Sequence, residues 1–365
     1  MPHALPASEI LAHLIDVHCH PTDAPSIAAS TIESLPCTLC AMSTQEGDQS
    51  KVASLARARP DRVVPAFGYH PWWAHRISLS APVPDHAAHY RALFLSSSSS
   101  PSSPSPPPSA ELETAFARLL PTLPPPISLA DVLADVRTHL TEFPTAMLGE
   151  VGFDRAARIP FAGANASDGG SGQTLSPFST PFAHQLAILE AQLALAVELR
   201  RNVSLHSVKA SGQTRALFDR MAATHGAAWF AISVDVHSCT LSPEVWRDIE
   251  KHHPNVYLSL STAINGRSQG YIALIRACAP TRILVESDYH DACDAPGRTW
   301  DMACKVAETH GWPIEDAWED RPDESQWGVV RRLEANWRAF LTGGHLPPVK
   351  QVRARERRRR DYSLD

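Results

Sequence analysis

The sequence predicts an α/β protein built as a (β/α)8 TIM barrel, and two observations lead to this fold class. Short apolar, β-branched runs alternate with segments of helical character along most of the chain, as they do in repeated strand–helix units. Eight such runs are present, and a barrel of this type usually needs about 250 residues. The predicted strands are 14–20, 37–43, 63–70, 146–153, 203–208, 229–237, 256–262 and 283–290.

The predicted helices lie between these strands. Parallel neighbours need a crossover connection, which is usually an α-helix, so the position of each helix supports a parallel sheet. The predicted helices are 48–59, 111–120, 129–142, 182–201, 211–225, 242–252 and 270–278.

Two insertions and a tail account for the rest of the 365 residues. Residues 96–109, SSSSSPSSPSPPPS, have a low-complexity composition that cannot bury a core, and we expect a disordered insertion there. Residues 159–180 are rich in Gly, Ser, Asn and Pro and predict a long loop after the fourth strand. We therefore expect a single barrel domain over residues 1–345, followed by a basic tail over 346–365.

The composition is that of an ordinary globular protein, with 44% hydrophobic and 20% charged residues. The net charge of −6 argues against a surface covered in positive potential, so any contact with nucleic acid would be local. The seven cysteines are odd in number and scattered, which favours reduced thiols inside the cell. No apolar stretch is expected to span a membrane, and the N-terminus lacks the features of a secretory signal. We expect a cytoplasmic or nuclear protein, or both.

The first predicted strand ends in IDVHCH, with two histidines one residue apart. Side chains alternate faces along a strand, so His18 and His20 project to the same side and can share one metal ion. The alternative is a solvated strand end, because the chain has 18 histidines. The residues at the ends of the other predicted strands distinguish the two interpretations.

Most of the other predicted strands also end in ionisable residues. In a (β/α)8 barrel the C-terminal strand ends face one shared cavity, where such groups would be costly to desolvate without partners. Nitrogen and carboxylate ligands suit zinc, manganese or iron, and magnesium is possible. The residues are His18, His20, His70, Glu150, His206, His237 and Asp288.

Six of these residues are enough to hold two divalent ions. We expect one ion at His18, His20 and Asp288 and a second at His206 and His237. Glu150 would bridge the two. Two ions about 3.5–4 Å apart can activate a shared water and stabilise a phosphoryl or carbonyl oxygen. The site therefore predicts hydrolysis.

Motifs over most of the chain resemble one known family. LIDVHCHPTD, GYHPWW, LGEVGFDR, LHSVKASG, VHS and ILVESDYH occur in the order and spacing of the TatD-related metal-dependent hydrolases of the amidohydrolase superfamily. The resemblance implies a (β/α)8 fold, a two-metal site and DNase action. It implies that His18, His20, Glu150, His206, His237 and Asp288 bind metal. Asp288 would also accept a proton from the nucleophilic water, and His70 would face the substrate phosphate.

The chain departs from the family pattern at residues that would face the substrate. The fifth-strand motif resembles HSRDA, but this chain has HSVKA over 206–210, so Lys209 is a candidate substitute for the missing arginine. Cys-Phe-Ser-Gly after His237 is replaced by SCTL, and Thr-Asp-Ala-Pro is replaced by SDYH, which ends in His290. This pattern resembles a divergent fungal branch, some members of which are described as interacting with a cell-cycle scaffold protein.

Trp72 and Trp73 follow His70 in GYHPWW. Aromatic rings near a phosphate site can stack on the bases of a single strand, and equally they can pack on the barrel rim. The candidate substrate contacts therefore include residues of GYHPWW and residues at the positions that depart from the family pattern. They are His70, Trp72, Lys209 and His290.

Three functions are compatible with these features. The first is a metal-dependent hydrolase of ester bonds, a DNase that uses two divalent ions (Zn, Mg or Mn) on single-stranded DNA, DNA ends or another phosphodiester. The second is an amidohydrolase acting on a small amide, ester or lactone. The third is a non-catalytic binding protein that contacts a protein partner through the insertion or the tail. Within the tail, RARERRRR (353–360) could be a nuclear localisation signal, a phosphate-binding arm or a solvated segment.

Overall fold

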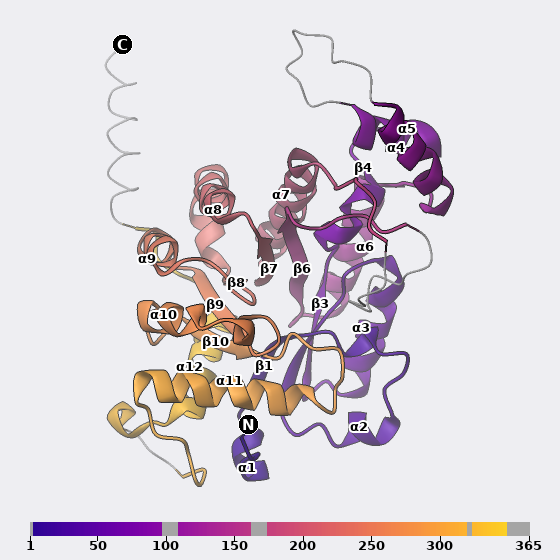
Figure 1. The fold of residues 1–365 in the computed structure, drawn as a ribbon. Coiled ribbons are helices and arrows are strands. Elements are labelled where there is room, and N and C mark those ends of the chain that lie inside the picture. The colour runs from indigo at the N-terminus through magenta and orange to yellow at the C-terminus, as the bar shows by residue number, and fades with distance from the viewer. Residues whose placement is uncertain (1–2, 97–108, 162–173, 320–322, 349–365) are drawn as a thin grey trace, which may run out of the picture.

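The computed structural model describes residues 3–96, 109–161, 174–319 and 323–348 (Figure 1). Nearly all of the predicted Ser/Pro insertion, the middle of the predicted loop 159–180 and most of the predicted basic tail lie outside the described residues. The expectations for those segments stay predictions.

Eight strands form one sheet in chain order, and all the paired neighbours are parallel. The backbone N–H of Asp288 donates to the carbonyl of His18 at 3.0 Å, and that of His20 donates to Tyr289 at 2.9 Å. These bonds join the first strand to the last and nearly close the sheet into a barrel, which confirms the predicted fold class. The strands are β1 (Ile15–Cys19), β2 (Thr38–Met42), β3 (Val63–Phe67), β6 (Met147–Asp154), β7 (Val203–Val208), β8 (Val234–Val236), β9 (Val256–Ser261) and β10 (Ile283–Glu286).

The sixth predicted strand, 229–237, is wrong over its first part. Only Val234–Val236 form β8, and the apolar residues Trp229 and Phe230 lie buried in the 3-10 helix η5 (Gly226–Ala231). A short apolar run satisfies a buried helical turn as well as a strand, and periodicity alone does not separate the two.

All seven predicted helices are present, and the described residues form five further helices that were not predicted. The later two, α11 and α12, pack on one another and on β10. The predicted helices are α3 (Glu46–Ala58), α5 (Ala110–Leu119), α6 (Leu129–Glu142), α7 (Phe182–Leu199), α8 (Ser211–His225), α9 (Pro243–His252) and α10 (Gly270–Ala277). The others are α1 (Ser8–Leu11), α2 (Ala29–Glu33), α4 (His86–Leu95), α11 (Ala295–His310) and α12 (Val329–Thr342).

Helix α7 is long and apolar enough to cross a membrane by length and composition, with a mean hydropathy of 1.2 over 18 residues. The sequence expectation that no stretch meets that criterion is therefore wrong. The helix packs against β6, and Ile188, Leu189 and Leu193 are buried in the core. Its apolar character is explained by this position in the barrel.

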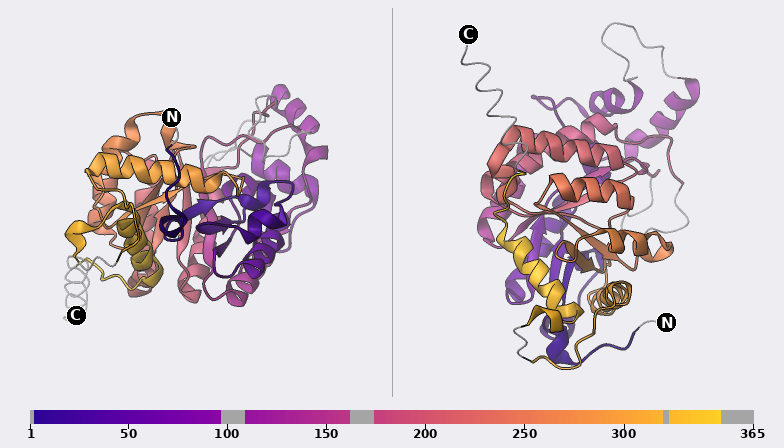
Figure 2. Two further views of the ribbon diagram at one scale, coloured as in Figure 1. Left: turned by 90° about the horizontal axis from the view of Figure 1, so that it is seen from below. Right: turned by 90° about the vertical axis from the view of Figure 1, so that its left-hand side faces the viewer.

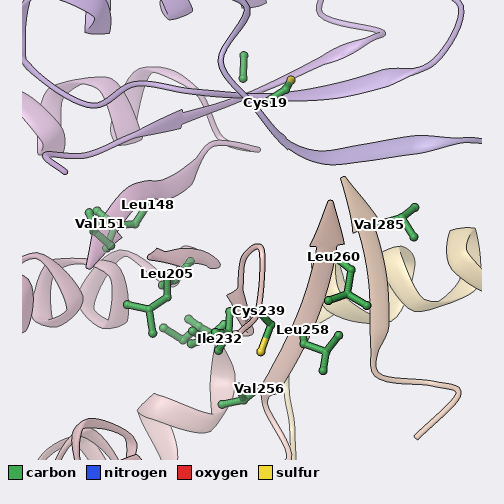
Figure 3. Close-up of a cluster of buried hydrophobic side chains, with 14 of the residues drawn as sticks. Cys19, Leu148, Val151, Leu205, Ile232, Cys239, Val256, Leu258, Leu260 and Val285 are labelled. Atoms are coloured by element: carbon green, nitrogen blue, oxygen red, sulfur yellow. The ribbon is translucent and has the colours of Figure 1, made fainter. Parts of the chain in front are cut away.

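The main core lies between the strands and the helices. Figure 3 shows buried strand side chains of this layer, among them Leu148 and Leu205. A second cluster packs Met42, Met147 and Leu284 of the strands against Trp337 and Phe340 of α12. Six of the seven cysteines are buried and all are free, as expected for packing thiols.

The connection from β3 to β6 forms an ordered arm, defined here as residues 71–96 and 109–128. It holds η2 (Pro71–Arg76), α4, α5, η3 (Leu120–Thr122) and a small parallel sheet of β4 (Ile77–Ser78) and β5 (Ile127–Ser128). A separate hydrophobic cluster supports the arm. Figure 1 shows α4 and α5 beyond one side of the barrel, and the views of Figure 2 agree. The members of the cluster are Tyr90, Phe116, Leu119, Leu123, Ile159 and Phe178.

Candidate metal centre

The structure brings together the six predicted metal ligands and His70 at the C-terminal end of the barrel. His18, Glu150 and His206 lie on strands β1, β6 and β7, and the others lie at or just beyond strand ends. Parallel strands carry their C-terminal ends to the same side, so side chains far apart in sequence meet there. At Gly152 on β6, a Cβ would overlap the carbonyl oxygen of His206, so the glycine allows these two strands to approach closely.

Glu150 lies at the centre of the cluster, and its two carboxylate oxygens contact different residues. Oε2 lies 3.1 Å from His20 Nε2 and 3.4 Å from His18 Nε2. Oε1 lies 2.7 Å from both His206 Nδ1 and His237 Nε2. The buried carboxylate therefore joins two groups of imidazole nitrogens.

Two further residues complete these groups. Asp288 Oδ1 lies 3.7 Å from His20 Nε2 and 3.9 Å from His18 Nε2, on the Oε2 side of Glu150. His70 Nε2 lies 3.2 Å from Oε1 of Glu150, on the other side. His70, which the sequence placed at the substrate, thus also touches the central carboxylate.

The donor atoms fit divalent cations. His18 Nε2 lies 3.1 Å from His20 Nε2, and His206 Nδ1 lies 3.0 Å from His237 Nε2. Imidazole nitrogens that face one another at such distances within a buried cluster are arranged as they are around a cation. Among the residues that the structure describes, four sets of three ligand atoms lie within 4.8 Å of one another, and Glu150 belongs to two of these sets. Imidazole nitrogen and carboxylate oxygen suit zinc, manganese or iron.

The histidines around the ionised Glu150 carboxylate fall into two groups. Contact with Glu150 outweighs burial and raises the pKa of His20 to about 9, and it also raises the pKa values of His206 and His237, whereas burial dominates at His18 and His70. Burial lowers the pKa of His18 to about 3 and that of His70 to about 4, so both rings are neutral at pH 7. Burial alone would raise the pKa of Glu150, but the surrounding histidines outweigh it and hold that pKa well below its usual range. Neutral imidazole and ionised carboxylate are the forms that bind metals.

Three residues lie behind the imidazole rings of the ligands. His18 Nδ1 lies 2.7 Å from Ser204 Oγ, and this hydrogen bond fixes which nitrogen of His18 faces the cluster. Asp154 Oδ2 lies 3.6 Å from His206 Nε2 and Glu286 Oε1 lies 3.7 Å from His237 Nδ1, beyond hydrogen-bond distance, so these carboxylates act on the two rings through their charge. Sequence analysis missed Ser204 and Asp154. For Asp154 a signal was present, because it lies four residues after Glu150 on the same strand and hence on the same face.

Asp288 and its neighbour Ser238 both adopt left-handed backbone conformations, with φ of 48° and 41°. Ser238 Oγ lies 3.1 Å from Asp288 Oδ2 and 2.6 Å from Glu286 Oε1, and its backbone N–H donates to the same Glu286 oxygen at 2.7 Å. Ser238 is the first residue of the SCTL substitution, so this departure from the family pattern lies in direct contact with a ligand.

The remaining candidate substrate residues lie at different distances from the cluster. Trp72 has 45% of its surface exposed, and its indole Nε1 donates to Asp154 Oδ2 at 2.9 Å. Lys209 and His290 are exposed residues beyond β7 and β10. In the part of the chain that the structure describes, neither forms an ion pair or hydrogen bond with the ligand cluster.

Known proteins are similar to this chain in sequence or in fold. A relative from Schizosaccharomyces pombe, Cut9-interacting protein scn1, is 27% identical over 90% of this chain and 98% of its own length. YJJV, a TatD homologue from Escherichia coli, superimposes with a TM-score of 0.54 and 14% identity over 92% of this chain and all of its own. An uncharacterized amidohydrolase from Saccharomyces cerevisiae gives a TM-score of 0.57 and 11% identity over 90% and 99% of the two chains.

The two solved structures establish likeness of fold, which agrees with the barrel described above. The sequence match goes further. The family model for TatD related DNase matches residues 15–320, which include all six predicted ligands as well as His70 and Asp154. The chain therefore belongs to the TatD related DNase family.

Proposed function

We propose that this protein is a two-metal hydrolase that cleaves phosphodiester bonds in DNA. One observation carries the proposal: the two oxygens of the buried Glu150 contact separate groups of histidine nitrogens. A carboxylate in this position can bridge two cations. The membership of the chain in a DNase family supports DNA as the substrate.

The residues present suit two metal sites. His18, His20 and Asp288 would hold one ion, His206 and His237 the other, and Glu150 would contact both. Bound divalent ions supply Lewis-acid polarisation of a phosphoryl oxygen and make a water molecule easier to deprotonate. Zinc, manganese and magnesium are the cations to test, because the ligands are imidazoles and carboxylates.

Asp288 is the proposed general base. Its side chain is 15% exposed, whereas that of Glu150 is 4% exposed, so the water that attacks phosphorus can reach Asp288 more readily. Oδ2 accepts a hydrogen bond from Ser238 Oγ, which fixes the orientation of the carboxylate. Oδ1 faces His18 and His20, beside the place where the proton is released.

His70 is the proposed donor to the substrate phosphate. Its Nδ1 accepts a hydrogen bond from the backbone N–H of Trp72 at 3.1 Å, so the proton of the neutral ring resides on Nε2. That N–H faces Oε1 of Glu150 at 3.2 Å, and with Glu150 engaged by bound cations it could donate to a phosphoryl oxygen instead. The ring is held in place by the turn that begins η2.

Positive charge beside the cluster supports a polyanionic substrate. Arg155 and Lys209 are exposed and directly follow the paired residues Asp154 of β6 and Val208 of β7. Their backbones are joined by a hydrogen bond from the N–H of Arg155 to the carbonyl of Val208. Two cations next to a catalytic centre would attract the phosphates that flank the scissile bond.

The decisive experiment combines metal analysis with a hydrolysis assay. Purified protein loaded with zinc, manganese or magnesium is expected to hold up to two ions per chain and to cleave single-stranded DNA, and a chelator should abolish cleavage and lower the melting temperature. A metal-loaded protein that cleaves small amides, esters or lactones but no phosphodiester would favour the amidohydrolase alternative.

Protein binding is a second candidate function, because the Schizosaccharomyces pombe relative is named for its interaction with Cut9. A protein partner in the cytoplasm or nucleus would be compatible with either an active or an inactive metal centre. Pull-down with the Asp288→Asn protein tests this candidate. Partner capture that persists without hydrolysis would show that binding does not depend on catalysis.

A further inference from the structure

A cavity of about 670 Å³ lies beside the metal cluster and has no role in the reaction described above. It is enclosed by the arm on one side and by the loop that follows β6 on the other. Asp154 forms part of its wall, and the same carboxylate lies 3.6 Å from His206 Nε2. The cavity and the metal cluster are therefore separated by a single side chain. The apolar wall residues are Trp72, Trp73, Leu123, Ile159, Phe161 and Leu175.

The polar groups in the wall are already engaged. Asp154 accepts hydrogen bonds from Trp72 Nε1 and from the backbone N–H groups of residues 156 and 157. The buried Gln185 side chain bonds to Asp154 and to the Thr180 carbonyl. Among the described lining residues, the cation is Arg158, which is exposed and donates to the carbonyl of Pro177.

The apolar walls and the engaged polar groups of the cavity favour an uncharged, flat ligand. A phosphate would meet the Asp154 carboxylate and the apolar side chains, so the cavity is unsuited to an anion. An aromatic ring system gains from contact with indole and phenyl groups, and stacking of a base on an aromatic side chain tolerates any base. The volume lies within the usual range of roughly 300–1,000 Å³ for small-molecule sites.

We propose that this cavity binds the nucleobase next to the scissile phosphate. The inference rests on the proposed function and names the part of the substrate that the arm recognises. Trp72 couples the two sites, because its backbone N–H orients His70 while its indole is held by Asp154 at the cavity wall. A base seated here would place its own phosphate toward His70. The cavity would then select substrates that end in, or expose, an unpaired base.

The test measures binding of uncharged nucleosides to the full metal-loaded chain by calorimetry, and needs no turnover. Thymidine and adenosine are expected to bind saturably, and 2-deoxyribose, which has neither base nor phosphate, should bind at least tenfold more weakly. Ala157→Phe puts a ring into the cavity while it keeps the backbone N–H bonded to Asp154, and should weaken nucleoside binding by roughly 10- to 100-fold. Phe161→Ala removes part of the wall and should weaken binding too.

Ala227→Phe is the matched control, because Ala227 is exposed in η5, which precedes β8 at the opposite end of the barrel. It should bind nucleosides like the original chain, and melting curves should show that the variants are folded. Nucleoside binding that is absent, or unchanged in both Ala157→Phe and Phe161→Ala, would overturn the proposal. So would saturable binding of an apolar peptide without binding of either nucleoside. Nucleoside binding without any phosphodiester hydrolysis would refute the proposed function and leave the base site in place.

Discussion

The metal cluster and the arm cavity adjoin each other, yet they are built in different ways. The ligands of the cluster sit on or directly after hydrogen-bonded strands of one barrel, so their relative positions follow from strand register. The cavity is walled by 3-10 turns and loop segments, which are supported by a small separate hydrophobic cluster. In the proposed function the barrel would supply the chemistry, and the arm would supply the shape that meets the substrate.

The largest effect is expected from Glu150→Gln. The amide keeps the shape of the side chain but cannot supply negative charge to both groups of ligands, so both ions should be lost together. We expect metal content to fall to less than about half an ion per chain and hydrolysis to become undetectable. Metal analysis and rate are measured on the same preparation. If the variant kept two ions, the Glu150 carboxylate would not be needed to bind metal.

Asp288→Asn should lower turnover by roughly 10²–10⁴-fold, because an amide cannot accept the proton that the attacking water loses. The ion held by His206 and His237 should be spared more than the ion held by His18 and His20, since Asp288 lies beside the latter pair. Near-normal turnover of this variant would show that another residue is the general base.

Asp154→Asn changes the residue that lies between the two regions. Loss of the charge behind His206 should weaken metal affinity about 10- to 100-fold, as expected for a carboxylate behind a metal ligand. The hydrogen bond from Trp72 Nε1 can persist, because asparagine keeps one acceptor oxygen. Nucleoside binding should therefore change less than metal binding. Equal losses in both would show that the cavity and the cluster act as one site.

The smallest effect on the metal centre is expected from Phe116→Ala, in the cluster that supports the arm. Loss of a buried phenyl ring costs about 3–5 kcal/mol in a well-packed core. Here the loss should appear as faster amide hydrogen exchange in α4 and α5, while metal content stays at the original value. A fall in metal content would show that the arm and the barrel unfold together.

The sequence predicted the regular part of the molecule well. The alternation of strands and helices identified the barrel, and the ionisable strand ends identified residues that the structure brings together around Glu150. The first part of the predicted strand 229–237 was wrong because an apolar run around Trp229 also suits a buried turn. Helix α12 was missed although Val330, Leu333, Trp337 and Phe340 have helical spacing.

The other omissions have a physical reason. Ser204 contacts His18 across the barrel, and no local pattern reveals a contact between residues 186 positions apart. Apart from α5, the arm escaped prediction because its short elements are stabilised by contacts with each other and with the loop after β6, and not by their own propensities. Long-range pairing of irregular segments is what a single sequence encodes least directly.

The hydrogen-bonded junction between the ends of β1 and β10 has a consequence for synthesis in the cell. His18 and His20 precede Asp288 by about 270 residues, so one group of ligands remains incomplete until Asp288 has been translated. A ribosome adds roughly 5–20 residues per second, so the first two histidines wait tens of seconds for their carboxylate partner. Binding of an ion by these three residues would then require a chain translated at least to Asp288, and a chain terminated before that residue would lack the carboxylate ligand.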